Sequence, residues 1–548
     1  MAGDKMIKYI LVLMLLLLGG CAKTDADVSL PLLEINANTT YTFNQDDFYT
    51  DYNDAVLLKN TNQTIEINRA GTYLFSGNYQ YGVVVNAPQT DTVRLVLENA
   101  HWENCSTPAI DVLSAKKVQI SLPKGMTTKI SSASSGDCHL INAKAPLIFN
   151  GEGTLQMTAS DKTAIQADDD LIFISGNYNI NSVNQAINSN RLIAIYNAGF
   201  NINSQSGDAI HLSDSSGQGI IYIQDGSFHL TSQADGIASD GALIIQNGSF
   251  DITTSANDDN ISQKGLKAGN ILQVNDGTYT LKTSDDAIHC KDNCTLQGGT
   301  YAIKTSGKGV HADACLTIND ITLDIHQCDE GLEAKVITIN QGNLKIKAND
   351  DGINASDVNS TADRGAESGC EIIFNGGKTI INASGDGLDS NDRITINGGE
   401  IYVYSDGRGD GALDYESEMV IYGGTLIACG YSQMAALPSG SSSQASVVFR
   451  LDEAVHQKAT FTNNNDKIII AWCPDGAYDH VIISSPKIES GNVYILTIGD
   501  QRYDITTAGT INYFGTIPIE NRMPLQDFKG QTTEMHFSKK DKPWDLKQ

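Results

Sequence analysis

Basic residues are scarce in this chain: 37 lysines and arginines oppose 65 aspartates and glutamates over 548 residues, for a formal net charge of −28. A charge of this sign repels phosphate backbones, so we expect no nucleic-acid partner. It also repels acidic polysaccharides unless a cation lies between the two. Proline is rare as well, with 11 residues, whereas hydrophobic residues make up 41% of the chain. This composition excludes a disordered chain and provides enough apolar material for a large core.

Long apolar segments are missing beyond the N-terminus, where residues 9–18 form a short apolar run after Lys5 and Lys8. The run is too short for a bilayer span of about 20 residues and is typical of a signal peptide. The Leu-Gly-Gly-Cys sequence that ends at Cys21 resembles a bacterial lipobox. We therefore predict a lipoprotein signal peptide over residues 1–21, lipidation of Cys21, and an exported protein anchored to a membrane at the cell envelope or surface. The alternative is an ordinary signal peptide in which Cys21 falls by chance.

The repeats in the middle of the chain lack the helical half of a leucine-rich repeat and are too short for a propeller blade. Each copy contains acidic residues, a small residue, an aliphatic residue, an alternating strand, a glycine turn and a second strand, as in residues 284–305. The aliphatic positions are Ile165, Ile187, Ile210, Ile237, Leu266, Ile288, Val310, Leu332, Ile353, Leu388 and Leu413. Their commonest spacing, about 22 residues, fits one coil of a parallel β-helix with three short strands. Successive coils then lie about 4.8 Å apart, and equivalent side chains form straight rows.

Acidic residues crowd the rows that flank the aliphatic positions of the last three coils. In earlier coils, from Lys264 to Glu330, lysines alternate with acids as in a ladder of ion pairs. The last coils have oxygen ligands instead, at Asp350, Asp351, Asn354, Asp386, Asp389, Asp410 and Asp414. Carboxylates stacked at about 5 Å repel one another by about 1–3 kcal/mol per pair, and a hard cation relieves this repulsion. We predict calcium here, with Asp285 and Asp286 as weaker candidates; the alternative is a set of solvated aspartates that serve only turn geometry.

Two histidines, His289 and His311, are one repeat apart, with Lys267 and Glu333 at the equivalent positions of the neighbouring coils. With Glu333 they could form a polar binding strip or a transition-metal site. We favour a hydrogen-bonded stack, because no sequence motif requires zinc here. Tyr415 is a candidate for stacking on a sugar ring, so the candidate binding residues are His289, His311, Glu333 and Tyr415.

Several stretches of the chain resemble the bacterial carbohydrate-binding, pectate-lyase-like β-helix proteins that bind calcium. The resemblance extends from about residue 65 to about residue 515 and is carried by residues 71–78, 93–100, 108–112, 350–355, 385–391 and 411–415. It implies a right-handed parallel β-helix, extracellular display, bound calcium and affinity for cellulose or acidic pectic glycans. It also implies that calcium is ligated by Asp350, Asp351, Asp386, Asp389 and Asp414.

The domain organisation follows from where the periodicity begins and ends. We expect a tether and N-terminal cap over residues 22–64, the parallel β-helix over 65–430, a small β-rich C-terminal cap domain over 431–520 and an irregular tail over 521–548. Caps are needed because an open coil exposes unpaired strand edges. The predicted fold class is therefore all-β, and we expect a monomer.

The predicted function is that of a cell-surface lipoprotein that binds polysaccharide on a calcium-bearing face without cleaving it. One alternative is a calcium-dependent lyase of the pectate type, in which a base removes a proton that calcium has acidified. Lys264 and Lys267 are the candidate bases, although neighbouring carboxylates would raise the pKa of such a lysine and oppose that role. A second alternative is a non-catalytic adhesin with a protein partner.

Overall fold

The computed structural model describes residues 40–134, 137–255, 258, 260–360 and 369–516, all within one compact unit that begins at Thr40. The predicted signal peptide with Cys21 and the predicted tail over residues 521–548 lie outside the described residues. Within the described part of the chain, no helix has the length and apolar character needed to cross a membrane.

Nearly all regular structure in the described residues is β, which confirms the predicted all-β class. One short 3-10 helix, η1 (Gln45–Phe48), precedes 49 strands. Of these strands, 45 belong to one largely parallel sheet, and four form a separate antiparallel sheet. The four are β44 (Ala459–Asn463), β45 (Ile468–Trp472), β47 (Val493–Ile498) and β48 (Gln501–Thr506).

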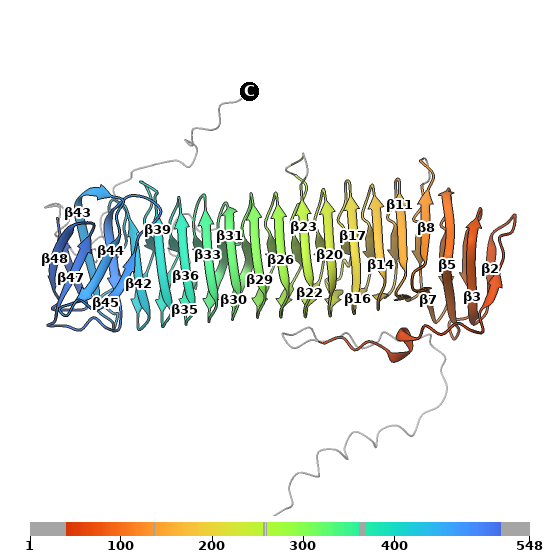
Figure 1. The fold of residues 1–548 in the computed structure, drawn as a ribbon, viewed down its shortest axis with the longest axis horizontal. Helices are drawn as coiled ribbons and strands as arrows, with labels where there is room; N and C mark the ends of the chain where they lie inside the picture. The colour runs from red at the N-terminus through yellow and green to blue at the C-terminus, as the bar shows by residue number, and fades with distance from the viewer. Residues whose placement is uncertain (1–39, 135–136, 256–257, 259, 361–368, 517–548) are drawn as a thin grey trace, which may run out of the picture. The chain divides into compact units, whose positions relative to one another are not determined.

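The parallel strands form three ladders, because most strands pair with the third strand further along the chain (Figure 1). Ladder A contains the aliphatic positions of the repeats. Its strands are β2 (Ile65–Ile67), β4 (Val83–Asn86), β6 (Ile110–Ser114), β9 (Ile141–Ala143), β12 (Ile165–Ala167), β15 (Ile187–Ser189), β18 (Ile210–Leu212), β21 (Ile237–Ser239), β24 (Leu266–Ala268), β27 (Ile288–Cys290), β30 (Val310–Ile318), β32 (Leu332–Ile339), β34 (Ile353–Ala355), β37 (Leu388–Ser390) and β40 (Leu413–Tyr415).

Ladders B and C form the other two sides of each coil. Ladder B includes β7 (Lys117–Leu122), β10 (Leu147–Gly151), β13 (Leu171–Phe173), β16 (Leu192–Ile195), β19 (Ile220–Ile223), β38 (Arg393–Ile396) and β41 (Glu418–Ile421). Ladder C includes β14 (Asn177–Ser182), β17 (Ala198–Ser204), β20 (Gly226–Ser232), β23 (Ser249–Thr254), β26 (Thr278–Thr283) and β29 (Thr300–Thr305), and it ends at β42 (Thr425–Gly430).

The pairing in ladder A follows the alignment of the repeats. Each aliphatic residue aligned from the sequence pairs with the next one, from Ile165 with Ile187 to Leu388 with Leu413. All of these side chains are fully buried. Because the pairing is parallel and in register, the residues beside each aliphatic position also lie above their equivalents.

Stacked aromatic rings fill the core along ladder C. Their centroids are 4.6–5.2 Å apart in successive coils, and the residues are Tyr178, Phe200, Phe228, Phe250, Tyr279 and Tyr301. Every ring in the row is buried. Isolated aromatic pairs prefer offset or edge-on contacts. The near-parallel rings seen here have the centroid separation of offset-stacked pairs, which the strand spacing of about 4.8 Å sets.

The C-terminal segment closes the open edge of ladder C. Strand β46 (Tyr478–Ser484) pairs antiparallel with β42 on one side and with β43 (Ser446–Val455) on the other. These main-chain hydrogen bonds satisfy an edge that would otherwise be exposed. Part of the predicted C-terminal domain therefore continues the large sheet instead of standing apart from it.

Residues 40–52, which we call the strap, lie along the outer face of ladder B. Tyr41, Phe43 and Phe48 pack against an apolar stripe formed by Ile148, Ile172, Ile174 and Ala194. The sequence analysis assigned residues 22–64 to a tether and N-terminal cap. The strap instead covers the side of the coils, because these outward-facing apolar residues would otherwise be exposed to water.

Removal of one ring from the aromatic row should destabilise the fold. Replacing Phe250 with alanine leaves a cavity between Phe228 and Tyr279, and we expect a loss of about 3–5 kcal/mol in the free energy of unfolding. Urea denaturation measures this change. The control, Lys282→Ala, alters an exposed side chain on the adjacent strand β26. Equal stability of the two variants would contradict the packed aromatic row.

Candidate functional site

The polar residues of the repeats gather at the corner where the chain enters ladder A. In the middle coils they form the ladder of ion pairs that the alternating charges indicate. Lys267 Nζ lies 2.8 Å from Asp235 Oδ2, and Lys308 Nζ lies 3.2 Å from Glu330 Oε2. Lys264 is paired with both Asp285 and Asp286. Each of these three lysines is thus held by acids from the next or previous coil.

The paired lysines are poorly suited to act as bases. Burial favours the neutral form of Lys264, but the carboxylates of Asp286 and Asp285 outweigh burial and raise its pKa. The same balance raises the pKa of Lys308 beside Glu330. A lysine that stays protonated cannot accept a proton, so this arrangement disfavours the lyase alternative in which Lys264 removes a proton.

Asp286, His289 and His311 converge within this ladder. The Oδ2 atom of Asp286 lies 2.9 Å from His289 Nδ1 and 3.2 Å from His311 Nδ1, and the two Nδ1 atoms are 3.1 Å apart. All three residues are buried. Among the described residues they are the one set of three His, Cys, Asp or Glu side chains with ligand atoms within 4.8 Å of one another. This group could hold a metal ion.

The sequence analysis placed the two histidines side by side and named Glu333 as a possible third residue of a metal site, whereas Asp286 is the third member of the close group in the structure. Glu333 lies on the Nε2 side of the His311 ring, 3.4 Å from that atom, and it also forms an ion pair with Lys308. Asp286 contacts Nδ1 of both histidines instead. It lies three residues before His289, at the turn that leads into the same strand, and its side chain points toward the two histidines. The Asp-x-x-His spacing was the available signal.

The chemistry of this group suits a transition metal better than calcium. Imidazole nitrogens favour zinc, copper, nickel or cobalt, whereas calcium prefers oxygen alone. A carboxylate beyond the far nitrogen, such as Glu333 next to His311 Nε2, is the usual outer partner of a metal-bound histidine. Burial opposes ionisation of Asp286, but hydrogen bonds from both histidines and the charge of Lys264 lower its pKa, so it remains a carboxylate.

The predicted calcium residues lie further along the same corner. We use the name acid row for Asp351, Asp386, Asp389 and Asp414. Asn354, Asp389 and Asp414 pair in successive strands of ladder A. The backbone N–H of Asp386 donates to Asp351 Oδ1 at 2.7 Å, and that of Gly411 donates to Asp386 Oδ1 at 2.5 Å. The structure therefore brings these four predicted residues together over three coils.

Like charges dominate the acid row. Burial and the neighbouring carboxylates raise the pKa of Asp386 to about 8 and those of Asp351 and Asp389 to about 7. No ion pair within the described ranges includes any of these three residues. Their carboxylate oxygens do not converge as closely as those of the Asp286 group. The acid row therefore combines mutual repulsion with the lack of a basic ion-pair partner among the described residues.

The remaining predicted residues occupy different positions around the acid row. A Cβ atom on Gly385 would come within 2.7 Å of Asp350 Oδ1 and 2.5 Å of Asp351 Oδ1, so glycine lets these carboxylates approach the next coil. Asn354 Oδ1 is buried without a hydrogen-bond partner among the described residues. Asp410 lies beside Gly407 at the same corner.

Tyr415, the candidate for stacking on a sugar ring, is half-buried. Its hydroxyl donates to the carbonyl of Leu437, which leaves little of the ring for a sugar.

Comparison with known proteins agrees with the resemblance. The family of carbohydrate-binding domain-containing proteins matches residues 61–309 and 311–411, which is more than half of the chain, and the chain belongs to this family. Among solved structures, the chain is similar to the polysaccharide lyase-like protein from C. thermocellum, solved as a gadolinium derivative. The two are 19% identical, with a TM-score of 0.30, over 49% of this chain and 91% of that one. A search of curated proteins found no match.

The raised pKa values of the acid row predict how stability depends on pH in the absence of divalent cations. The folded protein holds protons on Asp386 that the unfolded chain, with a pKa of about 3.9, has already lost. Stability should therefore fall as the pH rises from about 4 through about 8. In a chelating buffer, we expect the Tm of Asp386→Asn to fall less over this range than that of the wild type. Asp500→Asn, at an exposed turn, should follow the wild type; identical curves for all three proteins would contradict the prediction.

Cobalt(II) provides a spectroscopic probe of the Asp286 group. We expect the wild type to give visible d–d absorption in the presence of one equivalent of cobalt(II), because two imidazoles and a carboxylate form a low-symmetry site. His289→Ala and His311→Ala should lose this absorption. His326→Ala, which removes an exposed histidine, should keep it. Absorption that survives both site variants would contradict metal binding at this group.

Proposed function

We propose that this protein is a cell-surface lipoprotein that binds polysaccharide, and that calcium held by the acid row connects the protein to acidic glycans of the pectic type. The scaffold in this proposal is a right-handed parallel β-helix with about 22 residues per coil. Membership of the carbohydrate-binding family supports a polysaccharide ligand. The lipobox that ends at Cys21 supports an anchor in a membrane.

The observation that carries the calcium proposal is the charge of the acid row. Three carboxyl groups have pKa values of about 7–8, and no lysine or arginine within the described ranges pairs with them. A calcium ion takes about six to eight oxygen ligands. The carboxylates, together with the unpartnered Oδ1 of Asn354, supply part of this shell. A uronate carboxylate can fill the remainder, which overcomes the repulsion between an acidic protein and an acidic glycan.

Retention on immobilised glycans tests this function. We expect the wild type to be retained on a polygalacturonate gel with calcium and to be released by a chelator. Because the triple variant Asp351→Asn, Asp386→Asn, Asp389→Asn lacks the charges that hold calcium, its retention should fall at least tenfold while its circular dichroism is unchanged. Asp500→Asn serves as the control. Failure of the wild type to bind any glycan, with calcium present, would contradict the proposal.

A further inference from the structure

A groove lies away from the acid row, at the corner where the chain passes from ladder B to ladder C in the early coils. One cavity of about 420 Å³ lies between the strap and the turns that follow β7, β10, β13 and β16. A second cavity, of about 610 Å³, continues past the turn that follows β19. The two cavities share Glu152, Ser175 and Asn197, so they form one groove that crosses successive coils. These volumes are in the range of known ligand sites.

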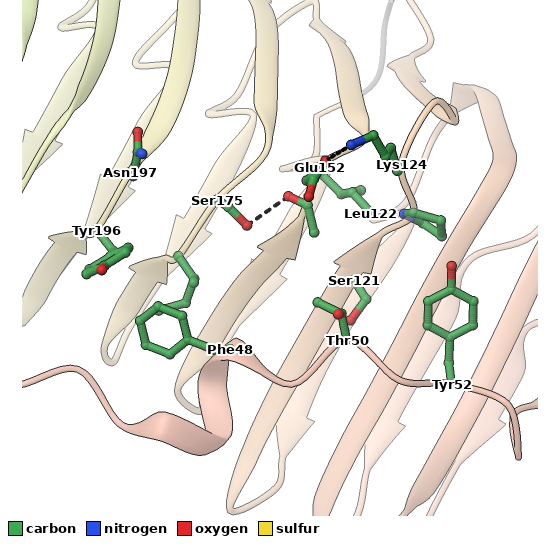
Figure 2. Close-up of a pocket in the computed structure, with 13 residues that line it drawn as sticks. Phe48, Thr50, Tyr52, Ser121, Leu122, Lys124, Glu152, Ser175, Tyr196 and Asn197 are labelled. Atoms are coloured by element: carbon green, nitrogen blue, oxygen red, sulfur yellow. Dashed lines mark hydrogen bonds and ion pairs between the residues drawn. The ribbon is translucent and has the colours of Figure 1, made fainter.

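Aromatic side chains line the part of this groove that lies beside the strap. Phe48 from the strap meets Tyr196 edge to face, with ring centroids 4.9 Å apart, while Tyr52 lies toward the other end of this part (Figure 2). Tyr196 is 40% exposed and is one of five exposed tyrosines among the described residues. Sugar rings have apolar faces that pack on aromatic rings and hydroxyl groups around their rim. Exposed aromatics beside polar side chains therefore suit a carbohydrate.

A buried polar network holds the strap in place. The side-chain amide of Asn150 donates to the carbonyls of Asp47 and Tyr49, at 2.8 and 3.0 Å, and that of Gln119 donates to the carbonyl of Asp46 at 2.9 Å. Lys117 Nζ pairs with Asp47 Oδ1 at 2.5 Å. Asn150 and Gln119 are completely buried. The wall of the groove is thus formed before a ligand arrives, which lowers the entropic cost of binding.

The charges along the groove favour a neutral ligand. Lys124 is the one basic residue among those that line the two cavities, and its Nζ lies 2.6 Å from Glu152 Oε2 (Figure 2). Asp225 adds a negative charge further along. A uronate chain would meet no free cation here and would be repelled. Serine, threonine and asparagine side chains supply hydrogen-bonding groups for hydroxyls instead.

We propose that this groove binds a linear neutral polysaccharide, without a metal. This inference rests on the proposed carbohydrate-binding function and assigns the neutral glycan to a second site. The groove runs across coils that are about 4.8 Å apart, so successive turns present a polar side chain at regular intervals, although the side chains differ in kind. A chain of repeating sugar units matches such a row, with Tyr196 and Phe48 packing against one ring.

Calorimetric titration with cellohexaose tests the groove. We expect Tyr196→Ala to weaken binding at least tenfold, and chelator to have no effect on the wild type. Asn197→Ala removes a polar group without touching the strap and should weaken binding about threefold or more. The matched control is Tyr422→Ala: Tyr422 follows β41 as Tyr196 follows β16, it is 56% exposed, and it lies outside the groove. Its affinity should equal that of the wild type.

The outcomes separate this inference from the proposed function. If both Tyr196→Ala and Asn197→Ala bound cellohexaose with wild-type affinity, the proposal that the groove binds this glycan would be wrong. A wild type that binds polygalacturonate with calcium but not cellohexaose would also overturn the groove while leaving the proposed function intact. A wild type that binds neither glycan would contradict both.

Discussion

In-register pairing between successive coils places the side chains of paired strand residues about 4.8 Å apart. Aromatic rings gain from this spacing, because stacked pairs such as Phe228 and Phe250 attract one another by about 0.5–1.5 kcal/mol beyond their burial. Stacked carboxylates lose about 1–3 kcal/mol per pair at the same distance. The main chain cannot spread to relieve this repulsion, since the buried rows hold the register. In the middle coils lysines and histidines separate the acids, whereas the acid row has no such partner among the described residues.

The same geometry produces two chemically different corners of the coils. At the corner before ladder A, rows of ionisable groups bring acids and histidines together and favour cations. At the corner after ladder B, turns with small polar residues lie beside aromatic side chains of the strap, and the charges there cancel or repel acids. An acidic and a neutral polysaccharide would therefore meet different corners of the coils.

The repeating part of this structure could be predicted from the sequence, and the local exceptions could not. The aliphatic row from Ile165 to Leu413 was evident because each residue faces the core of its own coil. Asp286 was assigned to a carboxylate site, since rows alone do not show that its side chain returns to His289 and His311. The sequence of the strap contains no repeat from which its position could be predicted. Its position depends on contacts with coils more than 100 residues away, such as the hydrogen bond from Asn150 to the carbonyl of Asp47, 103 positions apart.

Anomalous diffraction from crystals grown with terbium in place of calcium tests the central claim most directly. The account predicts a strong anomalous peak at the acid row, about 2.3–2.6 Å from carboxylate oxygens of Asp386 and Asp389. The opposite result is an acid row without a peak, with terbium bound only at isolated acids elsewhere on the surface. That result would show that the stacked carboxylates persist without a cation, and it would contradict the link between the coil spacing and metal binding.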